Sequence, residues 1–170
     1  GKPTTRRLGI EGYPAEGGLY ESLLVRTGLH KSSGEAAAFH KPGRNDCSNL
    51  GPLWKATDEF LKGAAKAPIS ASALYHLWRS RPFGVRDGLL PVLLLAYLLS
   101  RGDRYTVYLN DQLEVSLNDV TIDRLTSDPS ALSLRVFDAG DRARRLFDAI
   151  RAMLVEATGT PAAELKDSVS

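Results

Sequence analysis

Five arginines are the residues whose type and spacing are best suited to binding chemistry in this chain. Arg79, Arg81 and Arg86 surround a Pro- and Gly-containing break, and Arg101 and Arg104 flank Gly102. Guanidinium groups grip phosphate oxygens without reading bases, so these five are candidate nucleic-acid ligands. The alternative, which we favour, is a solvated surface with ordinary ion pairs.

Charge is distributed unevenly along a chain that is nearly neutral overall. The 170 residues carry a formal net charge of +2. Residues 51–110 contain eight Lys and Arg against four acids, whereas residues 111–170 contain seven against eleven. The balance excludes a polycation that coats nucleic acid, and it leaves a basic middle and an acidic tail.

Histidine, cysteine and carboxylate patterns do not indicate catalysis. His30, His40 and Cys47 lie in one region, but their spacing matches no zinc pattern, and a single cysteine excludes a disulfide framework. The sequence contains no phosphate-binding loop, Rossmann glycine fingerprint, nucleophile elbow or His-Glu-x-x-His pair. We therefore expect no catalytic residue, no metal and no cofactor. An enzyme that uses His40, His76 or an aspartate pair in a pocket is the least favoured alternative.

The two tryptophans and the aspartates also have structural interpretations. Trp54 and Trp78 are expected in the core or at a helix interface, with stacking on a base as the alternative. Asp119 and Asp123 are four residues apart on a short predicted helix. Their simpler interpretation is that they cap this helix and keep its surface soluble, and do not form a catalytic pair.

Periodicity and breakers define the elements that must position these residues. The spacing of apolar residues and breakers predicts helices over 18–27, 53–63, 70–80, 87–101 and 117–126. Ser70 or Ser72 is the expected cap of the second core helix, and Gly102 the expected end of the third. Alternation predicts a hairpin from 105–109 and 113–115, and a strand over 132–136. The polar stretch 31–49 is predicted to be a long loop.

The order of these elements predicts a mainly α fold with a small β component. Residues 51–137 form a winged-helix-like core with a β-hairpin, preceded by a helix and loop in 1–50 and followed by a long amphipathic helix and tail in 138–170. The third core helix lacks any charged or amide side chain over 88–99. It cannot read bases in a groove, so we expect it to be enclosed on all sides and the fold to serve packing or protein contact.

The final helix is the candidate partner-binding element. Its apolar residues recur at helical spacing from Ala143 to Ala157, between Asp138 as a cap and Gly159 as a stop. Its predicted partner-binding residues are Arg142, Arg145, Phe147 and Arg151. Thr160 and Pro161 are expected to begin another helix shortly before the chain stops, which is typical of a piece of a longer protein.

No signal peptide or membrane span is indicated. The most hydrophobic stretch, 89–99, is much shorter than the approximately 20 residues that a bilayer span requires. We expect a cytoplasmic location and no membrane partner.

Two stretches together resemble a known family. They are Gly-Gly-Leu-Tyr-Glu-Ser-Leu-Leu at 17–24 and Arg-Pro-Phe-Gly-Val-Arg-Asp-Gly-Leu-Leu-Pro-Val at 81–92, continuing through 99 and followed by Tyr-Thr-Val-Tyr at 105–108 and Asp-Pro at 128–129. This resembles the region downstream of the nucleotide-binding core in large bacterial P-loop ATPases of phage defence, such as BREX-type systems. The resemblance covers about 17–136 and carries over no functional residue.

The resemblance implies an accessory domain whose nucleotide site lies outside this chain. The expected function is a non-catalytic winged-helix-like interaction module of a larger bacterial ATPase, in phage defence or DNA transactions, with a protein or other parts of a larger chain as partner. The alternative is a domain that binds double-stranded DNA through phosphate contacts from the arginine-rich turn and wing.

Overall fold

The computed structural model describes residues 4–12, 14–33, 36–43, 46–114 and 117–136. Their helices are η1 (Arg6–Gly9), α1 (Ala15–Leu19), η2 (Tyr20–Val25), α2 (Leu50–Phe60), η3 (Leu61–Ala65), α3 (Ala71–Arg79), η4 (Asp87–Leu89), α4 (Leu90–Arg101), η5 (Gly102–Arg104) and α5 (Asp119–Ser127). Their strands are β1 (His30–Ser33), β2 (Ala36–Phe39), β3 (Ile69–Ser70), β4 (Tyr105–Leu109), β5 (Gln112–Glu114) and β6 (Leu132–Val136).

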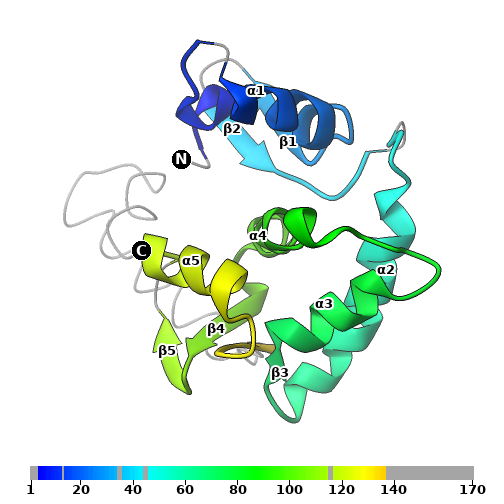
Figure 1. Ribbon diagram of the computed structural model, residues 1–170, viewed down its shortest axis with the longest axis vertical. Coiled ribbons are helices and arrows are strands. Elements are labelled where there is room, and N and C mark those ends of the chain that lie inside the picture. Colours follow the sequence, from blue (N-terminus) through cyan, green and yellow to red (C-terminus); the bar gives the residue numbers. More distant parts are fainter. Residues whose placement is uncertain (1–3, 13, 34–35, 44–45, 115–116, 137–170) are drawn as a thin grey trace, which may run out of the picture.

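Helix α4 lies at the centre of the molecule (Figure 1). The N-terminal helices and the β1–β2 hairpin lie on one side of it, α2 and α3 on another, and α5 with the four-stranded sheet on a third. The described part is thus mixed α and β, with two small antiparallel sheets. The prediction of a mainly α chain with a small β component, a hairpin and a later strand, lacked strands β1, β2 and β3.

The enclosure on all sides that was expected for α4 is found only in part. Six of its residues are buried, and Leu93, Leu94 and Tyr97 are at most 1% exposed. Pro91 stands in its first turn, where a missing N–H costs no intrahelical bond. Gly102 follows its end with a positive φ of 55°. Only Leu99, at 36%, is an exposed large hydrophobic residue of this helix.

The helices preceding α4 begin and end close to the expected positions. Ser70 is the cap of α3, because its hydroxyl accepts a hydrogen bond from the backbone N–H of Ala73 at 3.2 Å. The predicted break follows α3 directly. Val85 N–H then donates to the Trp78 carbonyl at 2.9 Å, which returns the chain toward the core before α4 begins.

The predicted hairpin and the later strand join one sheet of order β3-β6-β4-β5. Strands β4 and β5 pair antiparallel with Tyr108 opposite Leu113. Asn110 and Asp111 both have positive φ, 49° and 65°, as a tight hairpin turn requires. Strand β6 pairs antiparallel with β4, and Val107 lies opposite Leu134 on the buried face.

The prediction of a loop over 31–49 was wrong for its first part. Residues 30–33 and 36–39 form the antiparallel β1–β2 hairpin, with His30 opposite Phe39. Lysine, serine and alanine give this segment little intrinsic strand signal. Packing decides its conformation instead, because His30 and Ala37 are buried and the Phe39 ring lies 4.8 Å from the His30 ring.

The long amphipathic helix predicted after Asp138 lies outside the described residues. The candidate partner-binding residues Arg142, Arg145, Phe147 and Arg151 lie there too.

Truncation of Leu94 tests the enclosure of α4. Leu94→Ala should lower the free energy of unfolding by about 2–5 kcal/mol, because it leaves a cavity in a fully buried site. Leu99→Ala, in the same helix, should cost less than about 1 kcal/mol. Urea unfolding measures both values, and equal losses would contradict the enclosure.

Candidate functional site

The arginine-rich turn lies exposed at the beginning of α4. Arg81 and Arg86 are exposed. Arg79 is 43% exposed in its side chain, and its Nε donates to Asp87 Oδ1 at 2.6 Å. The Arg79 guanidinium also lies 6.0 Å from the Tyr75 ring centroid. Arg79 therefore forms an ordinary surface ion pair with Asp87, as the favoured interpretation expects, while Arg81 and Arg86 face solvent.

Arg104 lies at the opposite end of α4. It is exposed, with its guanidinium 5.8 Å from the Tyr105 ring centroid. Because α4 has 12 residues, its ends are about 18 Å apart. The structure thus places the exposed candidate arginines as two groups that bracket a helix, not as one cluster.

Arg101 does not belong to either exposed group. Its side chain is 4% exposed, and Nη2 donates to Asp58 Oδ2 at 2.5 Å. The guanidinium also lies 5.1 Å from the Tyr97 ring centroid. Arg101 was therefore wrongly grouped with the surface phosphate ligands: the last turn of α4 points it toward α2 and the core.

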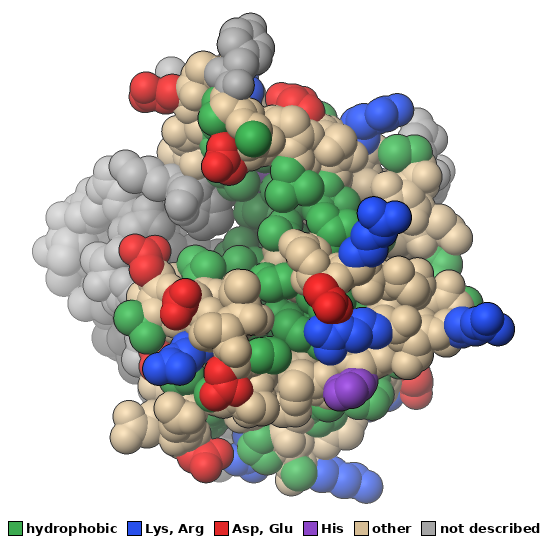
Figure 2. Space-filling model, in the orientation of Figure 1, with side chains coloured by type: hydrophobic (Ala, Val, Ile, Leu, Met, Phe, Trp, Pro, Cys, Tyr) green, Lys and Arg blue, Asp and Glu red, His purple; other side chains and the backbone are tan. Residues whose placement is uncertain are grey.

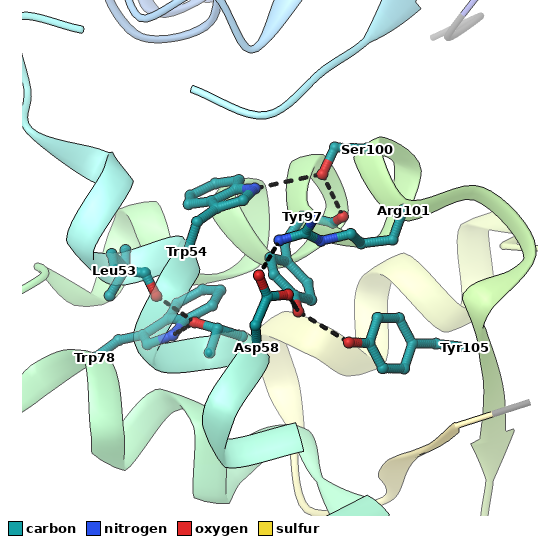
Figure 3. A network of polar contacts seen from close by, with 9 residues as sticks. Leu53, Trp54, Asp58, Trp78, Tyr97, Ser100, Arg101 and Tyr105 are labelled. Carbon is teal, nitrogen blue, oxygen red and sulfur yellow. Dashed lines mark hydrogen bonds and ion pairs between the residues drawn. The ribbon is translucent and has the colours of Figure 1, made fainter. Parts of the chain in front are cut away.

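Asp58 and Arg101 belong to a polar network that joins α2, α4 and β4 (Figure 3). The Tyr97 hydroxyl donates to Asp58 Oδ1 at 2.7 Å, so the Tyr105 hydroxyl, 3.0 Å away, donates to Tyr97. Trp54 Nε1 donates to Ser100 Oγ at 3.3 Å beside them. The Asp58 side chain remains 32% exposed, and its two oxygens accept hydrogen bonds from Tyr97 and from the buried Arg101 side chain.

Two buried tyrosines, Tyr97 and Tyr75, have raised pKa values. Burial, followed by the hydrogen bonds with Tyr105 and Asp58, raises the pKa of Tyr97 far above its ordinary value of 10.0. Burial likewise raises the pKa of Tyr75, whose hydroxyl donates to the Leu125 carbonyl at 3.0 Å. Both phenols are therefore neutral hydrogen-bond donors in the core at neutral pH.

The tryptophans are core residues, as expected. Trp54 and Trp78 are 3% and 0% exposed. Trp78 Nε1 donates to Thr57 Oγ1 at 2.8 Å, and this hydroxyl donates to the Leu53 carbonyl at 2.7 Å (Figure 3). Stacking of either ring on a nucleic-acid base would require unfolding of this core.

The residues considered for metal or acid–base chemistry are dispersed. His30 is buried, and its Nδ1 lies 2.9 Å from the Tyr20 hydroxyl, whereas His40, His76 and Cys47 are exposed. Within the described ranges, no three His, Cys, Asp or Glu residues are grouped so that they could hold a metal ion. A surface depression beside α1 is lined by Arg7, Gly17 and Glu21 among others, and contains none of these histidines.

The chain matches no family model, no curated protein and no solved structure. Among the helices of the described part, none has the length and apolar character needed to cross a membrane.

The sequence offered only one indirect signal for the Asp58–Arg101 pair. The two residues are 43 positions apart, and Arg101 stands beside a helix-stopping glycine like many exposed residues. Only the crossing of α2 and α4 brings them together. Helix α4 contains no other charged residue. This is the one feature of the sequence that indicates that a neighbouring element must supply the negative charge for Arg101.

Removal of either partner of this ion pair should have unequal effects. Asp58→Asn should cost about 3 kcal/mol of unfolding free energy, because it leaves the buried guanidinium unpaired. Arg101→Met should cost only about 1–2 kcal/mol, because Asp58 keeps solvent and Tyr97 as partners. Denaturant unfolding of both variants and of the double variant measures the difference. The double variant should lose less than the two single losses combined.

Alkaline titration tests the burial of Tyr97. Below about pH 10 the phenol is protonated in both the folded and the unfolded chain; above it, only the unfolded chain ionises. The free energy of unfolding should therefore fall as the pH rises beyond about 10, and Tyr97→Phe should reduce that slope. Tyrosinate absorbance recorded alongside unfolding would contradict this assignment if Tyr97 ionised while the chain was still folded.

Proposed function

We propose that this chain is a non-catalytic, winged-helix-like interaction module of a larger bacterial ATPase, in phage defence or DNA transactions. The ATPase and its defence role rest on the resemblance of residues 17–136. The proposal that the module does not read DNA bases rests on one observation, the burial of α4 by other parts of its own chain.

Strand pairing supports the winged-helix part of the proposal. The order α2, β3, α3, α4, β4 is that of a winged helix, and β3 pairs with β6, which pairs with β4. In this scheme, α4 occupies the position of the recognition helix. In the same scheme, the hairpin of β4 and β5 is the wing.

The environment of α4 supports packing over base reading. Strand β2 contacts α4, and the helix contributes Leu93, Leu94 and Leu98 to the common core. Exposure of these leucines in a DNA groove would forfeit roughly 1.5–3 kcal/mol for each. The N-terminal hairpin lies over the helix that a DNA-reading relative would leave open, so the surfaces left for partners are those around it.

Binding to a nucleotide-binding core tests the proposal. The chain should bind the P-loop ATPase core encoded in the same reading frame or a neighbouring gene, and should itself neither bind nor hydrolyse ATP. Isothermal titration with that core, with an unrelated P-loop ATPase as control, measures this. No binding to the core, together with tight binding to duplex DNA, would overturn the proposal.

A second candidate function is phosphate-mediated DNA binding, favoured by the exposure of Arg81, Arg86 and Arg104. If all three neutralise phosphates, log K should fall with log salt at a slope of roughly −2.7. The triple alanine variant should then remove the salt dependence, whereas Lys55→Ala on α2 should leave the arginine contribution intact. Under the interaction-module proposal, a duplex at low salt gives no binding that depends on these three arginines.

A further inference from the structure

The first elements of the chain are tied to one another by their own polar contacts. We name η1, α1, η2, β1 and β2 together the N-terminal unit; its two strands form a sheet of their own. The Tyr20 hydroxyl on η2 lies 2.9 Å from His30 Nδ1 on β1, which joins the helix to the hairpin. The Ala37 N–H donates to the Thr4 carbonyl at 3.0 Å, which joins the residues before η1 to β2. These contacts hold the elements of the unit together.

The remainder of the described structure is interleaved along the sequence. Strand β3, which precedes α3, pairs with β6 at the far end of the described chain. The Tyr75 hydroxyl of α3 donates to the Leu125 carbonyl of α5, and the Asp58–Arg101 pair joins α2 to α4. Among the described residues, the chain therefore passes from the N-terminal unit to this interleaved core once, before α2 begins at Leu50.

An apolar contact joins the N-terminal unit to the core. Strand β2 contacts α4, and its inner face carries Ala37, which is 8% exposed, and the half-buried Phe39, whereas the alanines on either side of Ala37 are exposed. Helix α4 contributes no charged side chain over 88–99. Figure 2 shows hydrophobic side chains gathered between the N-terminal unit at the top of the view and the elements below it. Such a contact is non-directional, and its loss leaves the Asp58–Arg101 pair intact.

We propose that the N-terminal unit is a cover that comes away from α4 as one unit, while α2 to α5 and the four-stranded sheet stay folded. Cooperative opening units are roughly contiguous along the chain and often coincide with supersecondary motifs, as this unit does. Its opening separates no strands of the four-stranded sheet, because β1 and β2 belong to the other sheet. It uncovers the side of α4 that contacts β2. The inference is independent of the proposed function, because it concerns contacts within one chain.

Hydrogen exchange of the full 170-residue chain, at urea concentrations below the unfolding transition, tests this proposal. The amides of Ala37, His40 and Gly43 are hydrogen-bonded within the N-terminal unit and should be protected at least about tenfold less than the central amides of α3. They should share one dependence on urea. This dependence should be weaker than that of α3, because opening of the unit exposes less surface than unfolding of the whole chain.

A matched pair of variants on β2 tests the contact itself. Ala37→Asp places a carboxylate on the buried face of β2 and should lower the protection of the N-terminal unit about tenfold or more, because a buried charge without a partner is costly. Ala38→Asp makes the same change at the neighbouring exposed position and should leave this protection unchanged. The protection of α3 should stay the same in both variants.

Four results would overturn the proposal. Equal protection and equal urea dependence of α3 and the N-terminal unit in the unchanged chain would mean that the chain opens only as a whole. A loss of protection in α3 as large as that in the unit, caused by Ala37→Asp, would mean the same. Different urea dependences of the η2 and β2 amides would mean that the unit does not open as one. Equal effects of the two aspartate variants would mean that the inner face of β2 does not make the contact.

Discussion

Burial of the apolar helix α4 is the constraint on which the rest of the described structure depends. A helix of leucines with no charged side chain between 88 and 99 must be covered on every side, and a single layer of helices covers only part of it. The helix is covered from three sides: by α2 and α3, by α5 with the sheet, and by the N-terminal hairpin (Figure 1). Their arrangement around α4 follows from the free energy of removing these leucines from water.

Apolar burial alone would not select one orientation of these elements, because leucines pack in many ways. The polar network at the end of α4 supplies direction. Asp58 on α2 accepts from Tyr97 and Arg101 on successive turns of α4, and Tyr105 on β4 completes the chain of hydrogen bonds. Since an unpaired buried guanidinium is costly, only a narrow range of α2–α4 crossings satisfies the network.

This arrangement divides the surface available for function. The candidate arginines that remain exposed stand at the two ends of α4, while much of the helix itself is buried. The exposed candidate arginines therefore form two separate groups around a largely buried helix and do not form one continuous cationic track.

Local pattern in the sequence was sufficient to predict most helices, a serine cap at Ser70 or Ser72, the β4–β5 turn, strand β6 and the burial of much of α4, since each depends on neighbours within a few residues or on hydrophobicity alone. The β1–β2 hairpin escaped prediction because its residues favour strands only when His30 and Phe39 pack together. The Asp58–Arg101 pair, and with it the removal of Arg101 from the surface, depends on residues 43 positions apart. Tertiary structure alone decided these features, because the free energy that fixes them comes from contacts between distant elements and not from the local preference of any residue.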